Sequence, residues 1–102
     1  QLSSMSGNMV RFYTGLCVLN SSTGSKQCDC VIFDVYFRDL CMSEIERYLK
    51  IEQPYNCAGS FKSEALGISL INKMEGDDPS ALIGLPLIRL RRMLSLEGFD
   101  IP

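Results

Sequence analysis

The chain contains no histidine, and this absence removes several kinds of chemistry from it. Neither a Ser-His nor a Cys-His catalytic pair can be formed from these residues alone. The cysteines include no C-x-x-C pair, and the shortest spacing, Cys28-x-Cys30, places two side chains on one face of a strand. Two ligands without a nearby histidine make a poor zinc site, so we do not expect zinc here.

The five cysteines are Cys17, Cys28, Cys30, Cys41 and Cys57. Disulfide frameworks of secreted proteins normally come in even sets, so this odd number favours reduced thiols. The N-terminus also lacks the basic and then apolar order of a secretory signal. We therefore expect a cytoplasmic protein.

Long apolar runs and a strong charge of either sign are also missing. No run approaches the roughly 20 apolar residues of a membrane span. The net charge of −2 gives no general attraction to nucleic acid or to anionic membranes. The 102 residues are 46% hydrophobic and 22% charged, which is ordinary for a folded globular protein and unlike a disordered one. We expect one domain or part of one, with neither a membrane nor a nucleic-acid partner.

The hydrophobic pattern predicts the order β-β-α-β-α, an α/β fold with a mixed α+β sheet. A short helical start at 1–8 ends at Gly7-Asn8. Strands are predicted at 9–22 and 27–40, with turn residues at 21–26 between them, and a third strand at 65–74. Helices are predicted at 43–54, and from Pro86 to a stop at Gly98.

Two of these elements carry detailed expectations. On the second strand, Val31, Phe33, Val35 and Phe37 form an apolar face, opposite a mixed face of Cys28, Cys30, Ile32 and Asp34. For the first long helix, Ser43 and Glu46 match an S-x-x-E capping box, and the inner stripe is Ile45, Tyr48 and Leu49. The stripe predicted for the last helix is Leu87, Leu90, Met93 and Leu94.

Four stretches together resemble the C-terminal half of the Maf family of nucleotide pyrophosphatases, over nearly the whole chain and in consistent order. They are SGNMVRFYTGL, FDVYFRDLCMSEIERYL, CAGSFKSEALGISLINKMEGDDPSALIGLPL and LRRMLSLEG. The form at 58–64, AGSFKSE, is most similar to the branch that hydrolyses 7-methyl-GTP. The commoner branch carries Gly-Ala-Tyr-Gly-Ile-Gln there. The resemblance implies the C-terminal part of a Maf/ITPase-like fold and hydrolysis between the α- and β-phosphates, with a divalent cation, Mg²⁺ or Mn²⁺.

The resemblance also has a clear departure, because family members are about twice as long. Their N-terminal half supplies a serine-arginine-arginine loop, the aspartate taken as general base and a lysine in a Gly-Lys-Pro motif, and none of these motifs occurs here. We therefore expect residues 1–102 to be a C-terminal half whose catalytic N-terminal half is absent, and to be inactive alone. No catalytic residue is assigned within the chain. Partners expected from the resemblance are a nucleotide substrate, the missing half and further copies of the chain.

The resemblance implies that Glu64, with Lys62 and Ser63, belongs to the substrate-binding set. A single carboxylate can accept two hydrogen bonds from the ring N–H and exocyclic amine of guanine, and methylation at N7 strengthens this donation. The alternative for Glu64 is a solvated carboxylate loosely paired with Lys62. Lys62 fits either a phosphate or ribose contact or a surface lysine whose stem covers apolar neighbours.

For the other charged residues the sequence favours structural roles over binding roles. Asp77 and Asp78 could hold Mg²⁺, but GDDP is ordinary turn and helix-entry chemistry, which we favour. Arg89, Arg91 and Arg92 fall in the last helix, where cations offset the helix dipole. A second function class, suggested by the family's association with inhibition of septum formation, is a non-catalytic interaction module.

Overall fold

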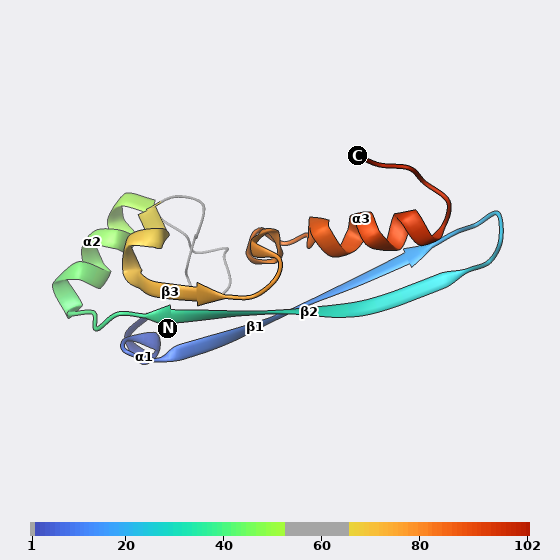
Figure 1. The fold of residues 1–102 in the computed structure, drawn as a ribbon. Coiled ribbons are helices and arrows are strands. Elements are labelled where there is room, and N and C mark those ends of the chain that lie inside the picture. The colour runs from blue at the N-terminus through green and yellow to red at the C-terminus, as the bar shows by residue number, and fades with distance from the viewer. Residues whose placement is uncertain (1, 53–65) are drawn as a thin grey trace. The chain divides into compact units, whose positions relative to one another are not determined.

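The computed structural model describes residues 2–52 and 66–102 and confirms the predicted order of elements (Figure 1). Three short elements, one α-helical and two 3₁₀, accompany the predicted strands and helices. In chain order the elements are α1 (Leu2–Met5), β1 (Met9–Leu19), β2 (Lys26–Phe37), α2 (Met42–Glu52), η2 (Leu66–Leu70), β3 (Ile71–Glu75), η3 (Pro79–Ile83) and α3 (Leu87–Leu96).

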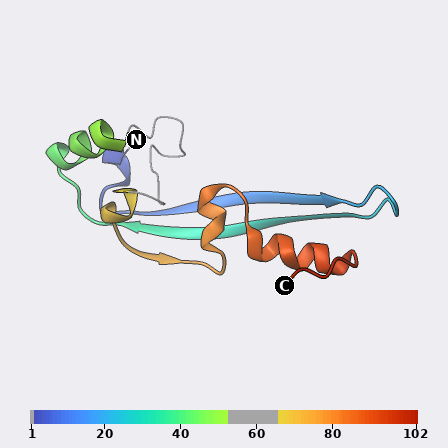
Figure 2. The same cartoon turned by 90° about the horizontal axis from the view of Figure 1, so that it is seen from above.

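The strands form one sheet in the order β1-β2-β3. The first two form a hairpin across the predicted turn residues and run side by side in both views (Figure 1, Figure 2). β3 pairs with β2 in antiparallel fashion, with Asp34 opposite Glu75 and Tyr36 opposite Lys73. The register then shifts, so that Phe37 lies opposite Ile71. This sheet agrees with the predicted α/β class.

The third strand is shorter than the sequence predicts. Residues 66–70 form the 3₁₀ helix η2, and the strand begins only at Ile71. β2 ends at Phe37, the partner of Ile71, so the ladder offers no strand residue for the preceding segment. Instead, the amide of Arg38 donates to the carbonyl of Leu70 at 3.1 Å. The alternation of Leu66, Ile68 and Leu70 therefore predicts a strand where the structure has a 3₁₀ helix.

The two faces of β2 differ as predicted. Val31, Phe33, Val35 and Phe37 are all buried, whereas Cys28, Cys30 and Ile32 on the opposite face are exposed. Asp34 is the exception on that face because it is buried. Arg11 donates to its two carboxylate oxygens at 2.8 and 3.0 Å, which compensates a charge that would otherwise be costly to bury. This hydrogen bonding lowers the pKa of Asp34 below its ordinary value.

The chain divides into two compact units, each with its own core. Unit 1 contains Gln1–Arg11 and Asp34–Glu75, and its buried apolar residues are Leu2, Met5, Val35, Phe37, Ile45, Tyr48 and Leu70. Unit 2 contains Phe12–Phe33 and Gly76–Pro102, and its buried apolar residues are Val31, Phe33, Ala81, Pro86 and Met93.

In unit 2, α3 begins and ends close to the predicted residues. Pro86 is the residue before the helix rather than its first member, and Gly98, with φ of 91°, follows the last turn. Met93 is buried as expected, but Leu87 is 55% exposed, so the predicted stripe is wrong at its first position. The described part of the chain has no helix with both the length and the apolarity to cross a membrane.

Glu97 fastens the end of α3 to the hairpin within unit 2. One carboxylate oxygen accepts from the Asn20 amide at 3.1 Å. The other accepts from the Ser25 hydroxyl at 2.9 Å and from the Gln27 amide at 2.6 Å. These three bonds lower the pKa of Glu97 below its ordinary value. The loop at 20–25 is thus held by the same side chain that ends the helix.

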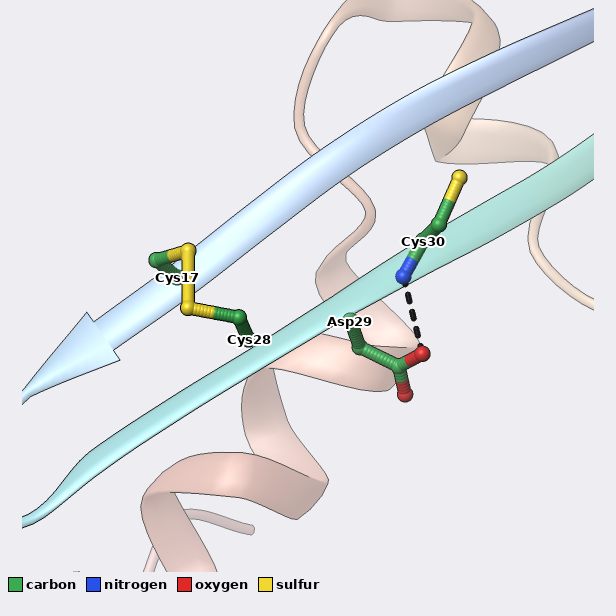
Figure 3. Close-up of a disulfide and its surroundings, with 4 residues drawn as sticks. All are labelled: Cys17, Cys28, Asp29 and Cys30. Atoms are coloured by element: carbon green, nitrogen blue, oxygen red, sulfur yellow. Dashed lines mark hydrogen bonds between the residues drawn. A yellow bond between two sulfur atoms is a disulfide. The ribbon is translucent and has the colours of Figure 1, made fainter.

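The structure corrects the expectation of reduced thiols at two positions. Cys17 on β1 and Cys28 on β2 are joined by a disulfide, with their Cα atoms 4.1 Å apart (Figure 3). The two cysteines lie on the two neighbouring strands of the hairpin, which brings residues distant in sequence close together. Cys30 and Cys41 are free and exposed. Because Cys28 is already bonded, Cys28-x-Cys30 does not present two thiolates to zinc.

Candidate functional site

The predicted substrate-binding residues Lys62, Ser63 and Glu64 lie outside the described residues. The two described elements nearest to them in sequence are α2, which ends at Glu52, and η2, which begins at Leu66. Both elements belong to unit 1. The structure therefore describes the two elements that flank the predicted site in sequence, α2 and η2, and the residues that join these elements.

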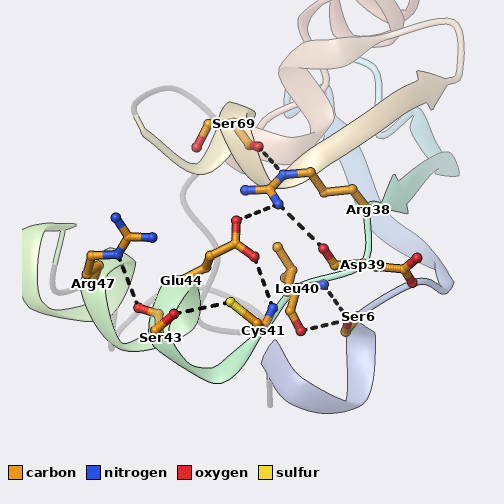
Figure 4. Close-up of polar contacts among 9 residues, drawn as sticks. All are labelled: Ser6, Arg38, Asp39, Leu40, Cys41, Ser43, Glu44, Arg47 and Ser69. Atoms are coloured by element: carbon orange, nitrogen blue, oxygen red, sulfur yellow. Dashed lines mark hydrogen bonds and ion pairs between the residues drawn. The ribbon is translucent and has the colours of Figure 1, made fainter.

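Arg38, directly after β2, joins these two elements (Figure 4). Its Nε donates to the carbonyl of Ser69 in η2 at 2.8 Å. Its Nη1 forms an ion pair with the Glu44 carboxylate in α2, also at 2.8 Å, and donates to the carbonyl of Asp39 at 3.4 Å. A planar guanidinium presents several donors in fixed directions, so one side chain can hold two elements at once.

Glu44 also caps the first turn of α2. Its second oxygen accepts from the backbone amide of Cys41 at 3.0 Å, and the Cys41 thiol lies 3.2 Å from the Ser43 hydroxyl. This is the reach-back half of a capping box, two residues earlier than predicted. The predicted pair of Ser43 and Glu46 is therefore wrong, because the helix already begins at Met42.

The hydrogen bonds at Glu44 have a large electrostatic effect. The backbone amide of Cys41, followed by the guanidinium of Arg38, lowers the pKa of Glu44 to about 2. The carboxylate is thus ionised throughout the physiological range. A charged acceptor near the first turn of a helix also interacts favourably with the helix dipole.

The segment before α2 is tied to the beginning of the chain. The Ser6 hydroxyl accepts from the amide of Leu40 at 2.7 Å and donates to the carbonyl of the same residue at 3.3 Å. The amide of Gly7 donates to the carbonyl of Arg38 at 3.0 Å, and Gly7 has a φ of 69°. Residues 38–41 are consequently fixed on both sides (Figure 4).

A small cavity of about 200 Å³ lies at this junction in unit 1, and its lining includes Arg38, Glu44, Tyr48 and Ser69. Tyr48 is buried, as the predicted inner stripe requires, together with Ile45. The cavity therefore combines a charged pair, a backbone carbonyl and an aromatic wall.

In unit 2, Asp78 has the turn role that the sequence favoured. It is 2% exposed and begins η3 by accepting from the Ser80 amide at 3.1 Å and from the Ser80 hydroxyl. Its other oxygen accepts from the backbone amides of Ile88 at 2.9 Å and Arg89 at 3.4 Å, in the first turn of α3. Burial raises the pKa of Asp78, but these bonds outweigh it and leave the pKa below its ordinary value. Both oxygens are used within the protein.

The arginines of α3 also make structural contacts in unit 2. Arg89 pairs with Asp29 of β2, and Arg91 donates to the carbonyl of Ile101 at 3.1 Å. Arg92 lines a cavity of about 400 Å³ with Asp77 and Cys30. Among the described residues, no group of three or more His, Cys, Asp or Glu side chains is placed to hold a metal ion.

Sequence reasoning missed Arg38 and Glu44 as the residues that join α2 and η2, the elements on either side of the predicted site in sequence. Glu44 did not carry the sequence mark of a capping box, because the residue three positions before it is Cys41 rather than Ser or Thr. No local signal marked Arg38, whose acceptor at Ser69 lies 31 residues along the chain.

Comparison with known proteins gives a consistent result. The model of the family described as Maf-like protein matches residues 1–97. The chain is 59% identical over 102 residues to a protein of Pseudomonas savastanoi pv. phaseolicola, covering all of this chain and 53% of the relative. It is 57% identical, over 52% of the relative, to a protein of Alcanivorax borkumensis. Both relatives are named 7-methyl-GTP pyrophosphatase.

The chain thus spans about half the length of the curated relatives it matches. The family match, in contrast, covers nearly all of the chain and agrees with the resemblance of its motifs. The chain therefore belongs to the family of Maf-like proteins.

Proposed function

We propose that this chain forms part of an enzyme that hydrolyses 7-methyl-GTP to its monophosphate and pyrophosphate. The observation that carries the proposal is the 59% identity, over all 102 residues, to a protein named 7-methyl-GTP pyrophosphatase. The chain contributes base recognition and scaffold, and the groups that cleave the phosphate anhydride lie on the part of the relatives that it does not cover.

Recognition of the methylated base falls to Glu64, assisted by Ser63. The carboxylate accepts from the ring N–H and the exocyclic amine of guanine, and the positive charge at N7 of the methylated ring strengthens both bonds. We assign Lys62 the role of a mobile cation that contacts a phosphate or the ribose of the nucleotide. AGSFKSE, the motif at 58–64, supports this assignment through its resemblance to the 7-methyl-GTP branch.

The divalent cation expected for this reaction, Mg²⁺ or Mn²⁺, does not fit the described residues. They contain no cluster of three potential ligands, and both oxygens of Asp78 are occupied by hydrogen bonds. We assign the cation to the substrate phosphates and to residues elsewhere in the enzyme. When bound, such a cation stabilises charge on the departing pyrophosphate.

Association with further polypeptide is part of the proposal. In unit 2, Leu19, Ile83 and Leu96 are all at least 66% exposed. Scattered apolar side chains are normal on a surface, but β1 also has an unpaired edge within the described sheet. We propose that the remaining part of the enzyme, and a second copy of the chain, bury this surface. The proposed compartment is the cytoplasm.

The test is an assay of pyrophosphate release from 7-methyl-GTP, GTP, dTTP and UTP. The chain is assayed alone and mixed with the remaining part of the Pseudomonas savastanoi relative, supplied as a second polypeptide. We expect turnover of 7-methyl-GTP, in preference to the other three, only in the mixture. Turnover by the chain alone would contradict the assignment of catalysis, and a preference for dTTP or UTP would contradict the substrate.

The role of Glu64 is tested in the same mixture with Glu64→Gln. We expect kcat/KM to fall more for 7-methyl-GTP than for GTP, because a neutral amide both accepts and donates and forms weaker bonds with a cationic ring. Glu46→Gln, at an exposed position on α2, is the matched control and should change neither value. Equal losses on both substrates would refute base recognition by Glu64.

A further inference from the structure

The disulfide between Cys17 and Cys28 lies at an exposed position of the hairpin in unit 2. Both cysteines are exposed, and their Cα atoms lie 4.1 Å apart (Figure 3). The rate of thiol–disulfide exchange depends on access of the attacking thiolate to a sulfur atom of the bond. This disulfide is therefore open to exchange with small thiol compounds in solution.

The loop that the disulfide closes is also closed by hydrogen bonds that involve no sulfur. The amide of Asn20 donates to the carbonyl of Ser25 at 2.8 Å, and the amide of Gly24 donates to the carbonyl of Asn20, also at 2.8 Å. The side-chain oxygen of Asn20 accepts from the amide of Ser22 at 3.0 Å. Reduction of the disulfide breaks none of these bonds.

The two strands are also held to α3 on both sides of the loop. Asn20, directly after β1, donates to Glu97 at 3.1 Å, and Gln27 on β2 donates to the same carboxylate at 2.6 Å. Gln27 also donates to the carbonyl of Met93 at 2.9 Å. One carboxylate therefore keeps the end of β1 beside the start of β2, so that the two thiols of a reduced chain stay close to each other.

We propose that Cys17 and Cys28 are a reversible oxidation site, which Glu97 keeps assembled in the reduced chain and which reacts with low-molecular-weight thiols and their disulfides. In oxidation, the thiolate of one cysteine attacks a sulfur of a small disulfide such as glutathione disulfide, forms a mixed disulfide and releases one small thiolate. The second cysteine attacks the protein sulfur of the mixed disulfide, closes the Cys17–Cys28 bond and releases the second small thiolate. The protein loses two electrons and two protons, and the small disulfide gains them.

The proposed compartment, the cytoplasm, gives this site a role in sensing. Thiols are kept reduced there, and disulfides that form are usually transient and either catalytic or redox-sensing. Neither Cys17 nor Cys28 is among the residues proposed to bind the nucleotide. The pair therefore records the balance between small thiols and their disulfides, and its chemistry does not depend on hydrolysis of 7-methyl-GTP.

The experiment measures the effective concentration of one thiol at the other. The 102-residue chain with Cys30→Ser, Cys41→Ser and Cys57→Ser retains only the two cysteines of the pair. It is equilibrated with glutathione and glutathione disulfide at a series of ratios, in buffer and in concentrated urea. Alkylation of the free thiols and mass spectrometry give the oxidised fraction, from which the effective concentration follows.

We expect the folded chain to give a value at least about 100-fold above that in urea, because thiols on a flexible chain meet at roughly millimolar effective concentration and fixed groups reach far higher values. Glu97→Ala should lower the folded value by about tenfold, since it removes the acceptor shared by the two strands. Asp100→Ala, which removes an exposed carboxylate of the same unit, is the matched control and should leave the value unchanged. If Glu97→Ala does not fold, Asn20→Ala decides the question, because it removes one of the hydrogen bonds to Glu97.

Three results would overturn the proposal. The first is a folded chain whose effective concentration is no higher than the value in urea. The second is the same value for Glu97→Ala, or for Asn20→Ala in its place, as for Asp100→Ala. The third comes from peptide mapping of the oxidised chain with all five cysteines, which should find Cys17 joined to Cys28 and would instead find Cys30 joined to either of them.

Discussion

Removal of the Asp78 carboxylate should destabilise unit 2 because this one side chain begins two helices. Asp78→Ala takes the acceptor from the Ser80 amide at the start of η3, and it leaves the amides of Ile88 and Arg89 in α3 without their partner. Replacing a capping residue by alanine destabilises a protein by about 1 kcal/mol. A buried donor left unsatisfied adds about 1–3 kcal/mol.

The expected loss is therefore about 2–4 kcal/mol in the free energy of unfolding, since both effects act at one site. Urea unfolding of the chain and of the variant measures this difference. Hydrogen exchange at the Ile88 amide tests the mechanism, because its protection should fall with the loss of the carboxylate. Asp78→Asn keeps one acceptor oxygen, so its free energy of unfolding should lie between that of the unsubstituted chain and that of Asp78→Ala.

The neighbouring Asp77→Ala is the matched control, since Asp77 is exposed. It should change the free energy of unfolding by less than about 0.5 kcal/mol, as surface substitutions usually do. Asp78 should also contribute its stabilisation fully above the ordinary aspartate pKa of about 4, and lose it as the pH falls through its lower folded pKa. Equal effects of Asp77→Ala and Asp78→Ala would refute the capping role.

Two further predictions concern packing and ionisation. Gly76→Ala drives a Cβ into the buried ring of Phe33, with ring atoms at 2.8 and 3.0 Å, and should destabilise by about 1–3 kcal/mol in thermal unfolding. Gly15→Ala meets no atom within 4 Å and should be nearly neutral, so equal effects would contradict the packing explanation. Glu44 should titrate with a pKa of about 2 in carbon-detected NMR, so its contribution to stability is complete above pH 4.5 and is lost as the pH falls toward 2. A midpoint near 4.5 would show that the contacts with Arg38 and Cys41 are absent in solution.

Patterns with a period of two predicted part of the sheet well. The alternation on β2 identified the buried faces of Val31, Phe33, Val35 and Phe37, because each strand residue points to the face opposite its neighbours. The same alternation failed at 66–70, where the partner strand had already ended. Sequence periodicity describes one segment, whereas a strand also needs a neighbour of matching length.

Among the candidate site residues, too, local sequence patterns were informative and long-range contacts were not. A motif resemblance predicts Lys62 and Glu64 as substrate-binding residues, because they are close in sequence and belong to one motif. Arg38 was not predicted because its role depends on Ser69, and that contact exists only after the chain has folded. The pairing of Cys17 with Cys28 was also inaccessible, since it depends on the register of the hairpin.

Two kinds of bond hold the tip of the hairpin, and the difference in their chemistry has a practical consequence. The Cys17–Cys28 bond closes the strands covalently, while the carboxylate of Glu97 grips the loop beyond it through Asn20, Ser25 and Gln27. Reductants open sulfur bonds but leave hydrogen bonds intact, whereas acid does the reverse. Reduction therefore removes the covalent link between β1 and β2 but leaves the hydrogen bonds between the hairpin and Glu97 in place. Acid, in contrast, protonates Glu97 and weakens the contact between the hairpin and α3 while the two strands stay covalently joined.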